Sequence, residues 1–375
     1  MGTEVNPNLD MLTWAIARAG YELRDFASTF PKVLDWLEKR KKPTLKQLEE
    51  FSHKVHLPFG YLFLENPPVE SLSFPFFRAG KSQNSSVSLN LYDTIQLMQR
   101  RQDWLVDYLI DNEFEELDFV GSFGSNSNCH EIVADMRRVL NLSDNWAASQ
   151  KNWTVALGHL SRVVEDAGVI IVFNSVVENS NKRSIAVDEC RGFVLVNKYA
   201  PFMFINAADG KAAQLFTIAH ELAHIWIGKS AGFDNDKLLP ADDPVELLCD
   251  QVAAEFLVPE TIFLDLWTKN QNISSLAQHF KISPIVLARR ALDLHKISKA
   301  EFFSFYNKYI AEVKLKKDNN SSGGDFYATQ NKRLSERFAA HVNQAVKEKQ
   351  LLYRDAYKLT GLKGDTYETY INKNL

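Results

Sequence analysis

Cysteine and histidine are scarce in this chain of 375 residues, which contains three cysteines and nine histidines. Cys129, Cys190 and Cys249 are widely separated and odd in number, which argues against a disulfide framework and favours free thiols in a reducing compartment. The chain lacks a long uncharged apolar run, so no membrane-spanning helix is expected. Its first residues lack the basic and apolar segments of a secretory signal. We therefore expect a cytoplasmic protein.

A strong excess of one charge is also absent, because the net charge is only -4. Its distribution is uneven: residues 1–70 have 9 basic and 10 acidic side chains, residues 71–270 have 16 and 27, and the remainder has 18 and 10. The central region is therefore acidic and the C-terminal region basic. The nearly neutral N-terminal region argues against strong, non-specific binding of nucleic acid there.

The most informative motif is His220-Glu221-Leu222-Ala223-His224, which lies inside an apolar segment. Residues four apart share one face of a helix, so the two imidazoles can bind one metal ion. Glu221 would then lie close enough to activate a water molecule, as in zinc hydrolases with the H-E-x-x-H motif. The alternative interpretation is a buried helix whose two histidines are satisfied within the core.

A catalytic zinc site usually needs a third protein ligand. Residues 244–259 predict a helix, because proline stands near the beginning and at the end of the segment. We expect Glu246 to be the third ligand and Asp250, one turn later, to accept a hydrogen bond from a liganding histidine. Glu246 could instead stabilise the helix dipole. Cys249 is a rival ligand, although a small buried side chain suits it better, and Glu255 is expected in solvent.

Three segments resemble the ImmA/IrrE family of zinc metallopeptidases: FTIAHELAHIW at 216–226, ELLCDQVAAEFLVP at 246–259 and RGFVLVN at 191–197. The chain departs from the family pattern at Leu248, where a second acidic residue is common. Known members are proteins of bacteria, phages and mobile elements, and the characterised ones relieve repression by cleaving a helix-turn-helix repressor. The resemblance implies that Zn²⁺ is bound and that Glu221 is the catalytic base, with three zinc ligands: His220, His224 and Glu246.

Residues 8–66 predict a bundle of short helices, and residues 36–49 resemble a repressor-like (XRE-type) helix-turn-helix. Its recognition helix is expected at about 31–39. Whether this region binds DNA, packs on the peptidase or recognises a partner protein is left open. The residues expected to contact DNA or a partner are basic: Lys32, Lys39, Arg40, Lys41 and Lys42.

The whole chain predicts an α+β fold that is mostly helical, with a zincin-like catalytic domain and a small sheet. Strands are expected at 168–174, 191–197 and 201–206, the last two as a hairpin, and a polar loop at 229–243. The predicted organisation is a helix-turn-helix-like domain at 1–70, a connector with a long helix at 71–128, the zinc peptidase at 129–270, a helix-turn-helix-like subdomain at 271–310, and a helical module at 325–375 ending in a turn at 361–367.

Two groups of side chains have alternative roles. Arg289 and Arg290 would face DNA or a substrate if 273–292 acted as a helix-turn-helix, or would lie in a subdomain that closes the peptidase. A donor that stabilises the oxyanion is also needed, and its candidates are Tyr199, Asn206, Arg289 and Arg290.

The predicted function is that of a zinc-dependent endopeptidase acting on a regulatory protein, such as a helix-turn-helix repressor, in a stress, mobile-element or phage-related switch. The substrate class comes from the resemblance. The alternative is an antitoxin or transcriptional regulator that binds DNA and a partner toxin. The expected partners are therefore a repressor or a toxin, with DNA as a further candidate at the N-terminal domain.

Overall fold

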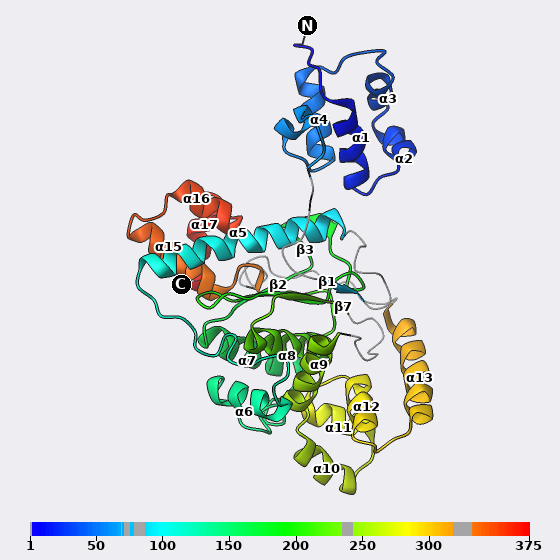
Figure 1. Cartoon of the computed structure of the whole chain (residues 1–375), viewed down its shortest axis with the longest axis vertical. Helices are drawn as coiled ribbons and strands as arrows, with labels where there is room; N and C mark the ends of the chain where they lie inside the picture. Colours follow the sequence, from blue (N-terminus) through cyan, green and yellow to red (C-terminus); the bar gives the residue numbers. More distant parts are fainter. Residues whose placement is uncertain (1, 69, 71–75, 79–86, 235–242, 318–331) are drawn as a thin grey trace. The chain divides into compact units, whose positions relative to one another are not determined.

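A computed structural model describes residues 2–68, 70, 76–78, 87–234, 243–317 and 332–375 (Figure 1). The chain divides into two compact units, Met1–Ser73 with Ser86–Asp93, and Phe74–Ser85 with Thr94–Leu375. The fold is α+β and mostly helical, as predicted. Among the described residues, no helix has both the length and the apolarity needed to cross a bilayer.

The N-terminal unit consists of short helices around an aromatic core. Thr44 begins one of them with a capping box, in which its hydroxyl accepts from the Gln47 amide while the Gln47 side chain accepts from the Thr44 amide. Phe26, Phe51 and Trp36 form the centre of the core. The recognition helix expected at 31–39 is only six residues long. The helices are α1 Leu9–Arg18, α2 Leu23–Thr29, α3 Lys32–Leu37, α4 Leu45–Lys54 and the 3-10 helix η1 Phe59–Phe63.

The second unit is built on a five-stranded sheet with the order β1-β7-β5-β6-β2. The predicted hairpin is confirmed, because β5 and β6 are antiparallel, with Gly192 opposite Ile205 and Leu195 opposite Phe202. β2 lies parallel to β6, and β3 and β4 form a separate two-stranded sheet. The strands are β1 Phe76–Arg78, β2 Ile170–Asn174, β3 Val176–Val177, β4 Ser180–Ser184, β5 Gly192–Leu195, β6 Phe202–Asn206 and β7 Ala231–Asp234.

Four of these strands were not predicted from the sequence: β1, β3, β4 and β7. β7 lies within the polar loop predicted at 229–243, and β1 lies within the predicted connector. β7 pairs with β5, and β1 pairs with β7 in parallel, so the sheet extends beyond the hairpin. Both segments gain hydrogen bonds for their backbone groups only by this pairing, which local periodicity does not reveal. Residues 235–242 of the predicted loop lie outside the described residues.

Helices cover both faces of the sheet, with α5 on one face and α7, α8 and α9 on the other (Figure 1). One apolar core runs through these last helices and into α11 and α12, through side chains such as Phe256, Phe280 and Leu287. Residues 273–292 therefore complete the same apolar core. The helices are α5 Leu89–Asp111, α6 Cys129–Val139, α7 Trp153–Asp166, α8 Lys211–Ile227, α9 Pro244–Leu257, α10 Glu260–Lys269, α11 Ile273–Phe280, α12 Pro284–Asp293 and α13 Lys299–Lys317.

The C-terminal module contains α15 Glu336–Lys347, α16 Tyr353–Thr360 and α17 Asp365–Asn374. The turn predicted at 361–367 was wrong at its end, because a full helix begins at Asp365. Buried polar side chains attach the module to α5 and α7. Arg101 of α5 donates to the Leu359 carbonyl at 2.8 Å, and the Ser335 hydroxyl donates to the Glu165 carboxylate of α7.

Glu165 should make folding stability depend on pH. Burial raises the pKa of its carboxyl from 4.5 to about 7, so the folded chain retains a proton that the unfolded chain releases. The free energy of unfolding should therefore fall, by about 3 kcal/mol, as pH rises from 4.5 to about 7. Denaturant unfolding should show that Glu165→Gln removes this fall, whereas Asp107→Asn, at an exposed carboxylate, does not. An equal fall in the Glu165→Gln variant would contradict the assignment.

Candidate metal centre

The H-E-x-x-H residues lie in the middle of α8, a 17-residue helix that is buried over most of its length. Gly228 ends the helix in the left-handed conformation, with φ 79°. α9 packs against α8, and the residue that caps its N-terminus is Asp243, whose side chain accepts hydrogen bonds from the backbone amides of Val245 and Glu246. This cap fixes the first turn of α9 and so places Glu246 opposite the histidines.

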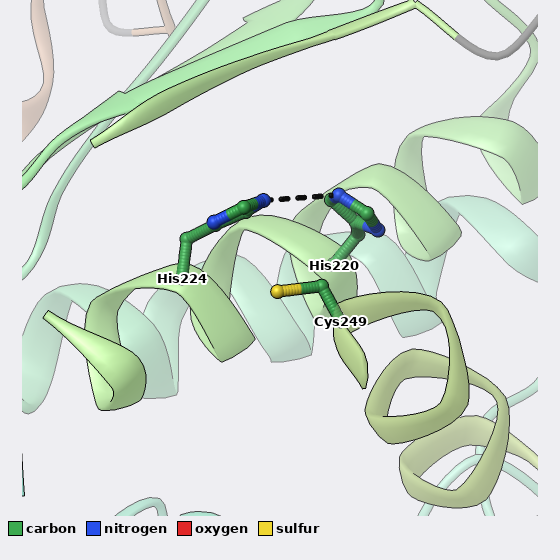
Figure 2. Close-up of side chains that lie close together, drawn as sticks. All are labelled: His220, His224 and Cys249. Atoms are coloured by element: carbon green, nitrogen blue, oxygen red, sulfur yellow. Dashed lines mark hydrogen bonds between the residues drawn. The ribbon is translucent and has the colours of Figure 1, made fainter. Parts of the chain in front are cut away.

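Three side chains bring their ligand atoms together. Nε2 of His220 and Nε2 of His224 are 3.2 Å apart, and Figure 2 shows one nitrogen of each ring pointing toward the other. Glu246 reaches both rings, with Oε2 3.1 Å from His220 Nε2 and Oε1 3.1 Å from His224 Nε2. Tetrahedral zinc places neighbouring nitrogen and oxygen ligands about 3.3 Å apart. The three donors therefore fit a small divalent cation.

The polar groups around the meeting point of these three ligands also suit a bound cation. Glu221 is fully buried, and neither of its carboxylate oxygens has a hydrogen-bond partner among the described residues. Burial raises the pKa of Glu221 well above its usual value. A buried polar group without a partner is costly, so the site suits a polar group that this chain does not itself supply, such as a metal ion with a water molecule.

The pKa values of the ligands show how closely they are coupled. Burial disfavours charge on His220, but its hydrogen bonds to Asp250 and Glu246 outweigh burial and raise its pKa to about 10. Burial would raise the pKa of Glu246, yet the two imidazoles hold it at about 2. Burial lowers the pKa of His224. The carboxylate of Glu246 is therefore ionised, as a metal ligand must be.

Asp250 lies beside His220, with Oδ1 3.0 Å from Nδ1 of the imidazole. A carboxylate at this nitrogen keeps the proton on Nδ1 and leaves the Nε2 lone pair directed at Glu246 and His224. Asp250→Asn should weaken zinc binding about 10- to 100-fold, as measured by competition with a chromophoric chelator. Asp265→Asn, at an exposed carboxylate of α10, is the control. Unchanged zinc affinity in Asp250→Asn would rule out the positioning role.

Cys249 is the rival ligand, because its sulfur and the ring nitrogens of His220 and His224 all lie within 4.8 Å of one another (Figure 2). Glu246 is favoured because it contacts both imidazoles at 3.1 Å. Burial and the neighbouring carboxylates also raise the pKa of the Cys249 thiol well above its usual value, and zinc requires the thiolate.

Gly192 is a residue of the site that sequence reasoning missed. A Cβ atom there would lie 2.5 Å from Cγ2 of Thr217, 2.9 Å from the Phe204 carbonyl oxygen and 3.3 Å from Oε1 of Glu221. Only glycine therefore allows β5 to pass this close to the face of α8 that carries Glu221. The signal in the sequence was the glycine at the start of an otherwise apolar strand.

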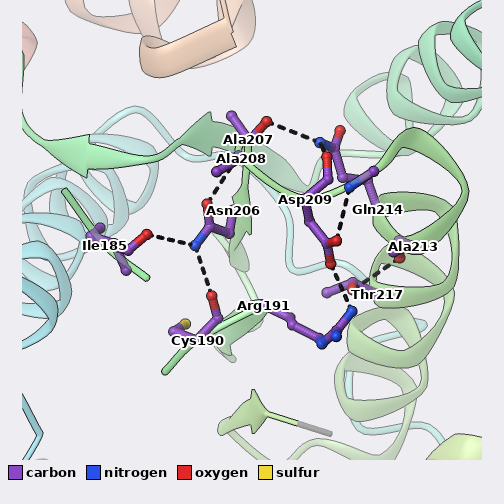
Figure 3. A network of polar contacts seen from close by, with 11 residues as sticks. Ile185, Cys190, Arg191, Asn206, Ala207, Ala208, Asp209, Ala213, Gln214 and Thr217 are labelled. Atoms are coloured by element: carbon purple, nitrogen blue, oxygen red, sulfur yellow. Dashed lines mark hydrogen bonds and ion pairs between the residues drawn. The ribbon is translucent and has the colours of Figure 1, made fainter. Parts of the chain in front are cut away.

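Hydrogen bonds hold the segments that precede β5 and α8 (Figure 3). Asn206 donates to the carbonyls of Ile185 and Cys190 at 3.2 and 2.9 Å, and accepts from the Ala208 amide. Arg191 pairs with Asp209 at 2.8 Å. Because its side chain is used in this way, Asn206 supports the loops and is not available as the oxyanion donor.

The remaining oxyanion candidates also have other positions or partners. The structure corrects the expectations for Glu255 and Arg290, which are both buried and form an ion pair with each other. Arg290 therefore does not face DNA or a partner, and Glu255 is not in solvent. Arg289 pairs with Asp293 at 2.9 Å. Gly192 is the first residue of β5, whereas Tyr199 comes after the last residue of that strand, Leu195.

Comparison with protein families agrees with this centre. Residues 164–292 match the Peptidase_M78 family model, described as an IrrE N-terminal-like domain. Residues 334–373 match a domain of unknown function, DUF8813. No curated protein gives a significant match to the chain. The first match contains every residue of the centre and supports a metallopeptidase-type function for this part of the chain.

Proposed function

We propose that the chain is a zinc-dependent endopeptidase whose substrate is a regulatory protein, such as a helix-turn-helix repressor. One observation carries the proposal: the ligand atoms of His220, His224 and Glu246 lie 3.1–3.2 Å apart beside the buried carboxylate of Glu221, which has no hydrogen-bond partner among the described residues. The Peptidase_M78 match supports the reaction class. The substrate class rests on the resemblance to the ImmA/IrrE family.

His220, His224 and Glu246 would hold the zinc ion, and Asp250 keeps His220 in the tautomer that can bind it. A bound zinc ion would polarise the scissile carbonyl and make a water molecule more acidic. Glu221 accepts the proton of the attacking water and delivers it to the leaving amine. Its complete burial keeps bulk water away from this proton transfer.

Cleavage of regulatory proteins tests this proposal. The zinc-loaded chain is incubated with the regulators encoded beside its own gene, with and without a chelator. We expect one regulator to be cut at a discrete site and the chelator to prevent the cut. Cleavage of generic peptides alone would refute the substrate class. Tight binding of a neighbouring toxin, without hydrolysis of any protein, would favour the regulator alternative.

We propose that the N-terminal unit contributes to partner recognition more than to DNA binding. Arg40 pairs with Asp35 and Glu38, and Lys41 pairs with Asp35. These ion pairs reduce the positive potential of the basic segment 39–42, on which affinity for phosphates depends. The unit therefore lacks the concentrated charge of a strong DNA-binding surface.

The expected DNA affinity of the full chain is weak, with a dissociation constant of about 10⁻⁶ M or above at physiological salt. Fluorescence anisotropy with the promoter region upstream of its own gene measures this constant. Nanomolar binding to that promoter, lost in a Lys32→Ala/Lys42→Ala variant, would show that the unit is an operator-binding domain.

A further inference from the structure

A second site lies between the peptidase domain and the C-terminal module. A cavity of about 580 Å³ is lined by α7, β2, the start of α8 and α15, and it contains none of the residues of the metal centre. Its volume is within the usual range for small-molecule sites, about 300–1,000 Å³. The two walls belong to different parts of the chain, because α8 lies in the Peptidase_M78 match and α15 in the DUF8813 match.

Two lysines line this cavity: Lys211, the first residue of α8, and Lys332. Burial lowers the pKa of Lys211, and repulsion by the positive charge of Lys332 lowers it further. Lys211 contacts only the amide oxygen of Gln214, at 3.5 Å, and within the described part of the chain neither lysine forms an ion pair. An anion between them would relieve this repulsion, and the positive end of α8 would add to the attraction.

The rest of the cavity suits a flat, partly polar body. Leu157, Ile171 and Phe173 supply an apolar wall. Gly158, in the middle of α7, has no atom within 4 Å of its Cβ position, so the floor of the cavity is open there. The acidic side chains of the lining can accept hydrogen bonds from hydroxyl or amino groups of a ligand: Glu165, Asp166 and Glu336.

We propose that this cavity binds a small organic phosphate with a ring body, of the size of a mononucleotide. The phosphate lies between Lys211 and Lys332, and the ring packs on Leu157, Ile171 and Phe173. Charge-assisted hydrogen bonds to the phosphate supply affinity, and the acidic lining selects donors on the rest of the molecule. The ligand bridges the peptidase domain and the C-terminal module, so its binding stabilises the folded chain.

Calorimetric titration of the full-length, zinc-loaded chain with adenosine monophosphate tests the proposal. We expect saturable binding, with adenosine and inorganic phosphate each binding at least about tenfold more weakly. The thermal unfolding temperature should rise with the nucleotide concentration. Lys211→Gln should weaken binding about tenfold by removing one charged contact. Lys198→Gln, at an exposed lysine outside this cavity, is the matched control and should bind as the native chain does.

Filling the cavity provides an independent test. Gly158→Leu places a side chain in the open floor and should abolish binding, whereas Gly158→Ala, which adds one methyl group to a helix, should keep both binding and stability. The absence of binding at millimolar nucleotide would overturn the proposal. Equal binding by the native chain, Lys211→Gln and Gly158→Leu would also overturn it, as would inorganic phosphate that binds as tightly as the nucleotide. Should Gly158→Leu fail to fold, Lys211→Gln and Lys332→Gln decide the result.

Discussion

Replacing Glu221 by glutamine is expected to abolish proteolysis while zinc stays bound. Glutamine keeps the size and hydrogen-bonding oxygen of the side chain but cannot accept the proton of the attacking water. The loss in kcat should be about 10²- to 10⁴-fold, the usual contribution of a general base. Because glutamine also removes a buried carboxylate that has no hydrogen-bond partner in the described part of the chain, thermal stability should not fall. Cleavage of one substrate by the two proteins at equal zinc content measures the effect.

A conservative change elsewhere provides the control for this experiment. Glu260→Gln, at the start of α10, should leave kcat unchanged. If Glu221→Gln cleaves at the native rate with its zinc bound, another residue must act as the base. If the variant instead loses its zinc, Glu221 contributes to metal binding.

The second large effect is expected at the third ligand. Glu246→Ala removes the carboxylate that contacts both imidazoles at 3.1 Å. Mutation of a residue that hydrogen-bonds to a metal ligand typically lowers metal affinity about 10- to 100-fold. Loss of a direct ligand should have a larger effect, so we expect zinc affinity to fall by more than about a hundredfold. Competition with a chelator gives the affinity, and peptidase activity should be lost with the metal.

Cys249→Ala separates the two candidate ligands, because the Cys249 sulfur lies in the same cluster. We expect this variant to bind zinc as the native chain does and to remain active, with a modest loss of stability from the small cavity that it creates. Native zinc affinity in Glu246→Ala together with loss of zinc in Cys249→Ala would reverse the assignment.

The local features of the site were predictable from the sequence because they depend on helical spacing. Residues four apart share a face, so His220 was expected beside His224, and Glu246 near Asp250. The proline and acidic residues at 243–246 indicated where α9 begins, and Asp243 indeed caps it. Helical spacing alone does not predict that α9 packs on α8. The expectation that Glu246 of α9 meets the histidines of α8 came from the resemblance to a peptidase family.

Features that depend on distant segments were not predictable in the same way. The burial of Glu255 follows from Arg290, which is 35 residues away in the sequence. β1 pairs with β7 across more than 150 residues, and neither strand has a strong alternating pattern. The close approach of Gly192 to Thr217 and Glu221 depends on how β5 packs on α8. Such contacts are set by tertiary packing, which overrides local preferences.

The metal content of the purified chain tests the central claim most directly. Mass spectrometry of the elements, with protein concentration from amino-acid analysis, should find one zinc ion per native chain. A folded His220→Ala/His224→Ala variant should contain none, because it lacks both imidazoles, whose Nε2 atoms lie 3.2 Å apart in the native chain. A native chain without stoichiometric metal, or a double variant that retains it, would contradict the account of a zinc peptidase.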